Sequence, residues 1–98
     1  MSRIKSIENN ILVDWLAKNP AWSYADGAIS ANFTFVDFTE AFSFLAVVAR
    51  LSDEADHHAK IENLYNRVRL TLTTHEAGNQ VPQRDLSLAE KISEWKGL

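Results

Sequence analysis

Hydrophobic and polar residues alternate along two stretches of the chain, ISANFTF at 29–35 and RVRLTLTT at 67–74. Successive side chains of a β-strand point to opposite faces of the sheet. This period of two therefore predicts two strands, each with one buried face and one face in contact with water.

Two hairpins are predicted around these strands. The segment SYADGAIS predicts a short strand that reaches the first alternating stretch through a turn at Asp26-Gly27. Residues 60–64 predict a fourth strand, which reaches the second stretch through a turn at Tyr65-Asn66. Hairpins imply antiparallel pairing in both cases.

Three other segments carry hydrophobic residues at the spacing of a helix. The first covers about 6–18, with Ser6 as its predicted N-cap. The second opens at Asp37, where Glu40 completes a capping-box pattern, and the third follows Asp85 as its predicted N-cap. In the first helix the residues expected to be buried are Ile7, Ile11, Leu12, Trp15 and Leu16. In the second they are Phe38, Ala41, Phe42, Leu45, Val48 and Ala49, with Phe44, Val47 and Leu51 widening the stripe. In the third they are Leu88, Ala89, Ile92 and Trp95.

The predicted order is therefore α-β-β-α-β-β-α over a single domain, residues 1–98. Three amphipathic helices need one apolar sheet face to pack on. We expect an α+β fold, a two-layer sandwich in which a four-stranded antiparallel sheet carries three helices on one face. The opposite face, which is rich in Arg, Thr, Ser and Asn, should meet solvent or a partner.

Composition narrows the possible functions. A formal charge of −3 provides no basic surface, so direct nucleic-acid binding is not expected. No apolar run approaches the roughly 20 residues that span a bilayer, so no membrane association is expected. The absence of cysteine excludes disulfides and zinc sites built on thiolates. These features predict a soluble, cytoplasmic protein.

The second hairpin brings the three histidines of the chain to one rim of the sheet. Continuing its pairing outward sets His58 opposite Thr73. It also sets His57 opposite Thr74, and His75 follows directly. Opposed residues lie about 5 Å apart, so the three imidazoles are expected to be neighbours.

Charged residues gather at the same rim. Asp53 and Asp56 lie at the end of the second helix, where the helix dipole favours a protonated imidazole. Arg84-Asp85 supplies a further charged pair at the start of the third helix. Nearby carboxylates should raise histidine pKa values above about 6.5, making both proton states available near neutral pH. Such a rim suits acid–base chemistry on a small polar molecule.

Two other interpretations of the histidines stay open at this point. Surface histidines are often simply solvated. The three histidines with one acid could also bind a metal ion. Adjacent histidines on one extended segment point in different directions, however, and their spacing matches no zinc pattern.

The chain also resembles a known family. Asp53, the pair His57-His58, an aromatic residue at Tyr65, then His75 and Asp85 are similar to the motif of pterin-4a-carbinolamine dehydratases. The stretch FTFVDFTEAFSFL at 33–45 and Trp22 also look like that family, so the resemblance covers nearly the whole chain.

This resemblance implies a dehydratase that acts on 4a-hydroxytetrahydropterin and needs no metal or organic cofactor. By family position, His57 and His75 are expected to be the acid–base groups and His58 the residue that orients the pterin. Supporting roles are implied for Asp53, Asp56, Arg84 and Asp85. The family also implies self-association as a homodimer or homotetramer, and an alternative role as a non-catalytic dimerisation module or coactivator.

Two departures from the family pattern stand near the histidines. Ala59, Lys60 and Ile61 occupy positions where the family usually has proline, an acid and an aromatic residue. The loop at 76–84 is about one residue longer than usual and contains Pro82, so Asp85 is a position to check. These departures bear on pterin specificity and turnover more than on the fold.

Overall fold

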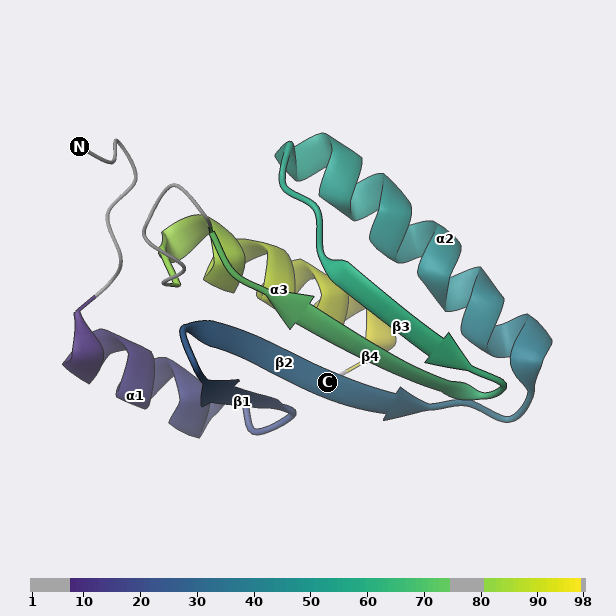
Figure 1. Ribbon diagram of the computed structural model, residues 1–98, viewed down its shortest axis with the longest axis horizontal. Helices are drawn as coiled ribbons and strands as arrows, with labels where there is room; N and C mark the ends of the chain where they lie inside the picture. Colours follow the sequence, from purple (N-terminus) through teal and green to yellow (C-terminus); the bar gives the residue numbers. More distant parts are fainter. Residues whose placement is uncertain (1–7, 75–80, 98) are drawn as a thin grey trace.

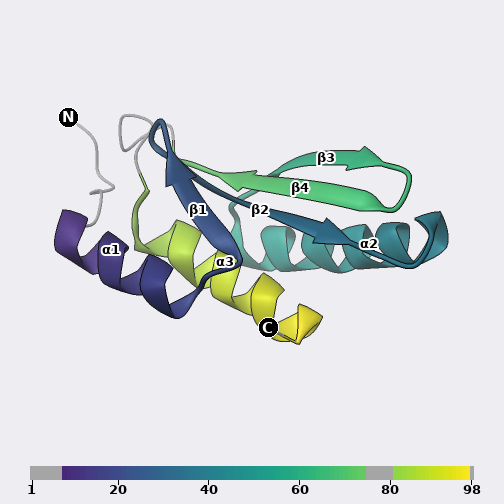
Figure 2. The ribbon, with the colours of Figure 1, turned by 90° about the horizontal axis from the view of Figure 1, so that it is seen from below.

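The computed structural model describes residues 8–74 and 81–97, and it confirms the predicted element order and the α+β fold. The three helices lie on one side of the four-stranded sheet (Figures 1 and 2). The elements are α1 (Asn9–Lys18), β1 (Trp22–Ala25), β2 (Ala28–Thr34), α2 (Phe38–Ala55), β3 (Lys60–Leu64), β4 (Arg67–Leu72) and α3 (Gln83–Lys96).

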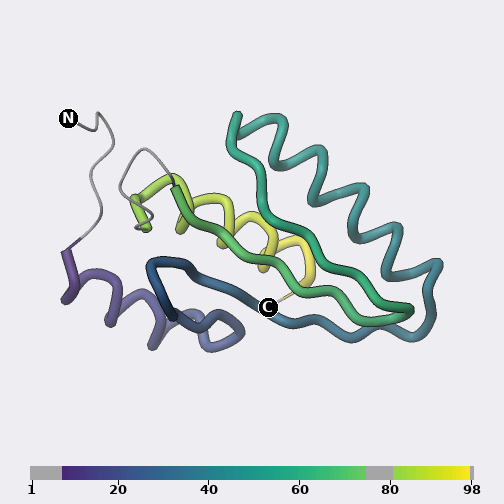
Figure 3. The backbone as a smooth tube through the Cα atoms, viewed as in Figure 1, coloured from purple at the N-terminus to yellow at the C-terminus, as the bar shows by residue number. Residues whose placement is uncertain are grey.

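The strands form one antiparallel sheet in the order β1-β2-β4-β3. The connection through α2 carries the chain from β2 to the edge strand β3, and the hairpin then returns β4 to pair with β2, as the backbone trace in Figure 3 shows. The register of the second hairpin sets Leu64 opposite Arg67 and Lys60 opposite Thr71, which confirms the predicted turn at 65–66.

Both predicted hairpin turns adopt left-handed backbone conformations. Asp26 and Gly27 have φ angles of 52° and 76°, as a two-residue β-hairpin turn requires. In the second turn Tyr65 has a φ angle of 53°. Asn66 then ties this turn to the end of β2: its side-chain amide donates to the carbonyl of Phe35 at 2.9 Å, and its own carbonyl accepts from the Phe35 N–H at 2.8 Å.

The core lies between the sheet and the helices. Phe44 of α2 is fully buried at its centre, with ring centroids 5.1 Å from Phe33, 5.0 Å from Phe35 and 5.6 Å from Trp95. Trp22 is also buried in the core, and its indole N–H donates to the hydroxyl of Ser93 at 2.8 Å. The alternating strand residues predicted to face inward are all buried: Ile29, Ala31, Phe33, Phe35, Val68, Leu70 and Leu72.

The predicted buried stripe of α2 is partly wrong. Phe38 and Phe42 are 47% and 57% exposed, and their rings pack on each other at 5.5 Å. Ala49 is exposed as well, whereas Phe44, predicted only to widen the stripe, is buried. Because α2 has hydrophobic residues on several sides, the spacing could not tell which side faces the sheet. The buried residues are Ala41, Phe44, Leu45, Val48 and Ser52.

Helix starts agree with the sequence only at α2. Asp37 is the N-cap, as predicted, and accepts a hydrogen bond from the N–H of Glu40 at 2.8 Å. Helix α1 begins at Asn9 with Glu8 as its N-cap, and the predicted cap Ser6 lies outside the described residues. Helix α3 has Pro82 as its N-cap, so Asp85 falls inside the first turn and is not the cap.

Candidate active site

The end of α2 determines where the two adjacent histidines point. Asp56 ends the helix in the left-handed conformation, with a φ angle of 50°. Its N–H and that of His57 both return to the last turn of the helix, the latter donating to the Ser52 carbonyl at 3.0 Å. This reversal of the chain directs His57 inward and leaves His58 outside.

His57 is buried and meets an aspartate of α3. Its side chain is 7% exposed, and its Nε2 is hydrogen-bonded to Oδ1 of Asp85, which has no exposed surface. His58 is 65% exposed and pairs with Asp53 instead, at 2.9 Å between Nε2 and Oδ1. The two adjacent imidazoles therefore belong to separate histidine–aspartate pairs.

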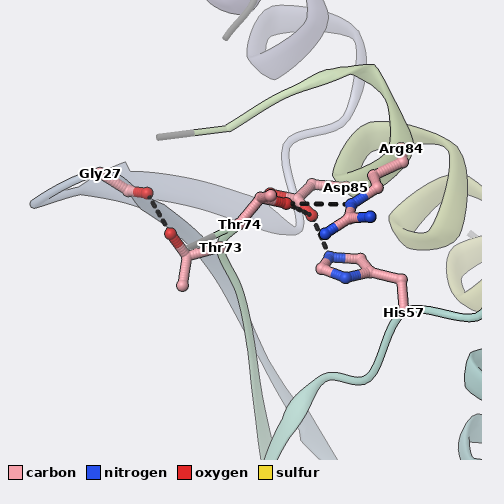
Figure 4. Close-up of polar contacts among 6 residues, drawn as sticks. All are labelled: Gly27, His57, Thr73, Thr74, Arg84 and Asp85. Carbon is pink, nitrogen blue, oxygen red and sulfur yellow. Dashed lines mark hydrogen bonds and ion pairs between the residues drawn. The ribbon is translucent and has the colours of Figure 1, made fainter. Parts of the chain in front are cut away.

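The two residues after β4 continue the alternation of the strand. The hydroxyl of Thr73 donates to the carbonyl of Gly27 at 2.8 Å, tying the end of β4 to the turn between β1 and β2 (Figure 4). Thr74 points the other way and is fully buried. Its hydroxyl donates to Oδ1 of Asp85 at 3.0 Å, the same oxygen that His57 binds.

The environment of Asp85 is dominated by its burial. Burial raises the pKa of Asp85 above its ordinary value of 3.8, because the ionised carboxylate loses its water. The charge of His57, the hydrogen bonds from Thr74 and His57 and the charge of Arg84 act against this increase. The second oxygen, Oδ2, is buried and has no hydrogen-bond partner among the described residues.

Arg84 completes the cluster from the same helix turn. Its Nε donates to the hydroxyl of Thr74 at 3.3 Å, so three segments of the chain contribute to one connected network: the residues after α2, the residues after β4 and the start of α3 (Figure 4). The network runs from Arg84 through Thr74 and Asp85 to His57. Only His57 among Thr74, Asp85 and His57 retains any appreciable exposed surface, so it is the group through which these residues could act on a small molecule.

The structure thus brings three of the predicted residues together: His57, Arg84 and Asp85. Asp85 does reach His57, although the sequence before it departs from the family pattern. The pair His58 and Asp53 lies on the exposed side, and Asp56 serves as the exposed C-cap of α2. His75 lies outside the described residues.

Sequence reasoning did not assign a role to Thr74, although it expected this residue to lie near His57. The sequence pattern does predict that Thr74 points inward, because Thr74 is two residues beyond Leu72 in the buried series Val68, Leu70 and Leu72. A hydroxyl at a fully buried position needs a hydrogen-bond partner, and here the partners are Asp85 and Arg84.

Two further features concern ions and membranes. In residues 8–74 and 81–97 no group of three or more His, Asp or Glu side chains is placed to hold a metal ion. In the same part of the chain, every helix is too short or too polar to cross a bilayer.

Comparison with known proteins relates the chain to one family. The family model described as pterin 4 alpha carbinolamine dehydratase matches residues 5–95. A relative from Prochlorococcus marinus, named provisionally as a pterin-4-alpha-carbinolamine dehydratase, is 42% identical over 91% of this chain and 93% of its own length. A relative from Rhizorhabdus wittichii with the same provisional name is 43% identical over the same shares.

Solved structures extend the likeness to the fold. A Brucella melitensis protein described as a transcriptional coactivator/pterin dehydratase superposes with a TM-score of 0.85 and 34% identity, over 92% of this chain and 97% of that one. A pterin dehydratase-like protein described as a RuBisCO assembly factor of the alpha-carboxysome shares the fold, with a TM-score of 0.63 and 21% identity over 76% and 87% of the two chains.

Proposed function

Since this chain belongs to the pterin-4-alpha-carbinolamine dehydratase family, we propose that it is a lyase that removes water from 4a-hydroxytetrahydropterin. The product is quinonoid dihydropterin, and 4a-hydroxytetrahydrobiopterin is the substrate to test first. The observation that carries the proposal is the buried pair of His57 and Asp85, held at the rim where the family motif has its histidines.

The reaction needs one proton donor and one proton acceptor. The imidazolium of His57 donates a proton to the 4a-hydroxyl as the C4a–O bond breaks, and water leaves. The adjacent ring nitrogen N5 supplies the electron pair for the new C4a=N5 double bond and loses its own proton to a second base, for which we propose His75. No metal or organic cofactor enters this balance. General acid–base catalysis of this kind contributes roughly 10²–10⁴-fold.

The other predicted residues take supporting roles. Asp85 orients the imidazole of His57 and stabilises its charged form. The exposed pair of His58 and Asp53 is available to orient the pterin ring, since both side chains reach solvent. Arg84 supports Asp85 through its hydrogen bond to the Thr74 hydroxyl. Asp56 acts as the C-cap of α2, where the chain turns and directs His57 inward.

We also propose that the protein associates with itself as a homodimer or homotetramer. All five residues of the edge strand β3 are exposed. Phe38 and Phe42 place two exposed aromatic rings on α2. Unpaired strand edges and exposed aromatic groups favour association of identical chains. Sedimentation should give a species of two or four chains at micromolar concentration, and a monomer at all concentrations would contradict this.

A second candidate function is that of a non-catalytic dimerisation module or coactivator. This second candidate is supported by the description of the Brucella melitensis protein, which names both a coactivator and a dehydratase. A protein that only binds a partner has no need of a buried histidine–aspartate pair supported by two more side chains, so the network favours catalysis.

Stopped-flow absorbance with chemically generated 4a-hydroxytetrahydrobiopterin tests the proposal. Chelator-treated wild type should accelerate dehydration, and His57→Ala and His75→Ala should each lose most of that acceleration. Folded wild type that leaves the spontaneous rate unchanged would rule out the dehydratase and leave the binding module. Acceleration that disappears with chelator in wild type would overturn the metal-free mechanism.

A further inference from the structure

We propose that Thr74 is a positioning residue that determines which nitrogen of His57 carries the proton. In this arrangement Nε2 of His57 stays protonated toward Asp85, and Nδ1 is the nitrogen that exchanges protons with a substrate. The placement of the proton follows from the network alone, whereas its use in catalysis rests on the dehydratase function proposed above.

Arg84 fixes the direction of the hydrogen-bond chain at its far end. A guanidinium nitrogen can only donate, so the hydroxyl oxygen of Thr74 must accept from Nε of Arg84 at 3.3 Å. A threonine hydroxyl has a single proton of its own. That proton is then available to Oδ1 of Asp85, which lies 3.0 Å from the Thr74 hydroxyl oxygen.

The direction continues through Asp85. Its Oδ1 accepts from Thr74 and also binds Nε2 of His57, so this oxygen acts as an acceptor toward both neighbours. If Asp85 takes up a proton, the place for it is the buried Oδ2, which has no partner in the described part of the chain. While the Thr74 hydroxyl donates to Oδ1, a proton on Asp85 can lie only on Oδ2, and Nε2 of His57 is the donor. Without that hydroxyl, Oδ1 can carry the proton and donate it to Nε2, which leaves the imidazole proton on Nδ1.

The other ring nitrogen of His57, Nδ1, lies on the opposite side of the ring from Asp85. Figure 4 shows the second ring nitrogen of His57 pointing away from Asp85. Thr74 and Asp85 have no exposed surface, so neither can touch a substrate, and both act through the imidazole. Two variants separate the hydroxyl from the shape of the side chain: Thr74→Val removes the donor at nearly constant volume, and Thr74→Ser keeps it.

Long-range ¹H–¹⁵N NMR of the full chain reads the proton position directly. Spectra are recorded at about pH 9, where an ordinary imidazole is neutral, and the His57 signals are assigned by comparison with His57→Gln. Wild type and Thr74→Ser should show the Nε2–H tautomer of His57. Thr74→Val should show a mixture of both tautomers. Thr71→Val, which alters a threonine of β4 outside the network, should match wild type.

The dehydration rate supplies a second readout. Thr74→Val should lose about tenfold in kcat with little change in KM, as when a partner that orients a functional imidazole is removed. Thr74→Ser should stay within about threefold of wild type. An Nδ1–H tautomer in wild type would overturn the proposal even if Thr74→Val does not fold, and so would a folded Thr74→Val with the wild-type tautomer. Wild type with the Nε2–H tautomer but without activity would support the proton placement and overturn only the dehydratase function.

Discussion

His57 and His58 stand next to each other in the chain, and each imidazole binds a carboxylate oxygen of an aspartate. The pair of His57 and Asp85 is buried and joins segments 28 residues apart, whereas both members of the pair of His58 and Asp53 are mostly exposed and lie five residues apart. Screening by water weakens the exposed pair, while the buried pair is held by further hydrogen bonds.

The difference shows that residue type alone does not determine what a histidine can do here. The left-handed cap at Asp56 sends one imidazole into the interior and leaves its neighbour in water. Of these two imidazoles, only the inward one is hydrogen-bonded into a network of buried groups in the described part of the chain. This difference supports the proposal that His57 takes part in the acid–base chemistry and that His58 orients the substrate.

The largest expected effect is kinetic. Asp85→Asn should lower kcat/KM for dehydration by about 10- to 100-fold, because the amide keeps an acceptor oxygen but removes the charge that stabilises the imidazolium. Asp53→Asn, the same change in the exposed pair, should stay within about threefold. Steady-state rates on the two variants make the comparison, and equal losses would mean that burial does not separate the pairs.

The next effect is on stability. Asp85→Ala leaves the hydroxyl of Thr74 and the Nε2–H of His57 buried without their shared acceptor. Each buried unsatisfied group costs about 1–3 kcal/mol, so the free energy of unfolding should fall by at least about 1 kcal/mol. Asp53→Ala should change it by less than about 1 kcal/mol, as is usual for exposed ion pairs. Urea unfolding followed by circular dichroism measures both, and a larger loss in Asp53→Ala would contradict the assignment.

A third effect depends on pH. Because burial raises the pKa of Asp85 above 3.8, the folded state binds its proton more tightly than the unfolded state does. The contribution to stability is full below pH 3.8 and is lost as the pH rises through the folded pKa. The free energy of unfolding of wild type minus that of Asp85→Asn should therefore decrease over this interval as the pH rises.

Urea titrations of both proteins across that pH range test the sign. Asp53→Asn serves as the control for a carboxyl of the exposed pair. A wild-type advantage over Asp85→Asn that grows with rising pH would show that the charges of His57 and Arg84 outweigh burial, and that the carboxyl is ionised throughout.

The smallest effect concerns salt. Raising ionic strength from about 0.01 to 1 M shortens the Debye length from about 30 to 3 Å, which screens exposed charges far more than buried ones. A double-mutant cycle on His58 and Asp53 should give a coupling in the free energy of unfolding that decreases with salt. The same cycle on His57 and Asp85 should give a larger coupling that changes little. A salt response of equal size in both cycles would remove the electrostatic distinction between the pairs.

Much of the fold could be predicted because local patterns and tertiary structure agree. Alternation in the strands predicted the inward residues Ile29 and Leu70, and the turn at 65–66 predicted the pairing register. The side of α2 that faces the sheet could not be predicted, since Phe42 and Phe44 are equally apolar and only packing distinguishes them. The start of α3 was misplaced because Asp85 is a favourable cap residue, whereas its carboxylate binds His57 and Thr74 instead.

The candidate site was partly visible in the sequence. Pairing of the second hairpin brought His57 toward Thr74, and the family motif singled out Asp85. The sequence could not reveal which of the two adjacent histidines is buried, because this depends on the left-handed conformation of Asp56. The network through Arg84 and Thr74 depends in turn on where α3 begins relative to the end of β4.

The central claim is that His57 and Asp85 act as one unit in dehydration. A double-mutant cycle with His57→Ala, Asp85→Asn and both changes together, measured as kcat/KM by stopped-flow absorbance, tests it most directly. We expect the double variant to be about as slow as His57→Ala alone, because Asp85 acts only through the imidazole. Losses that multiply in the double variant would show that the two residues act independently, which would contradict the account.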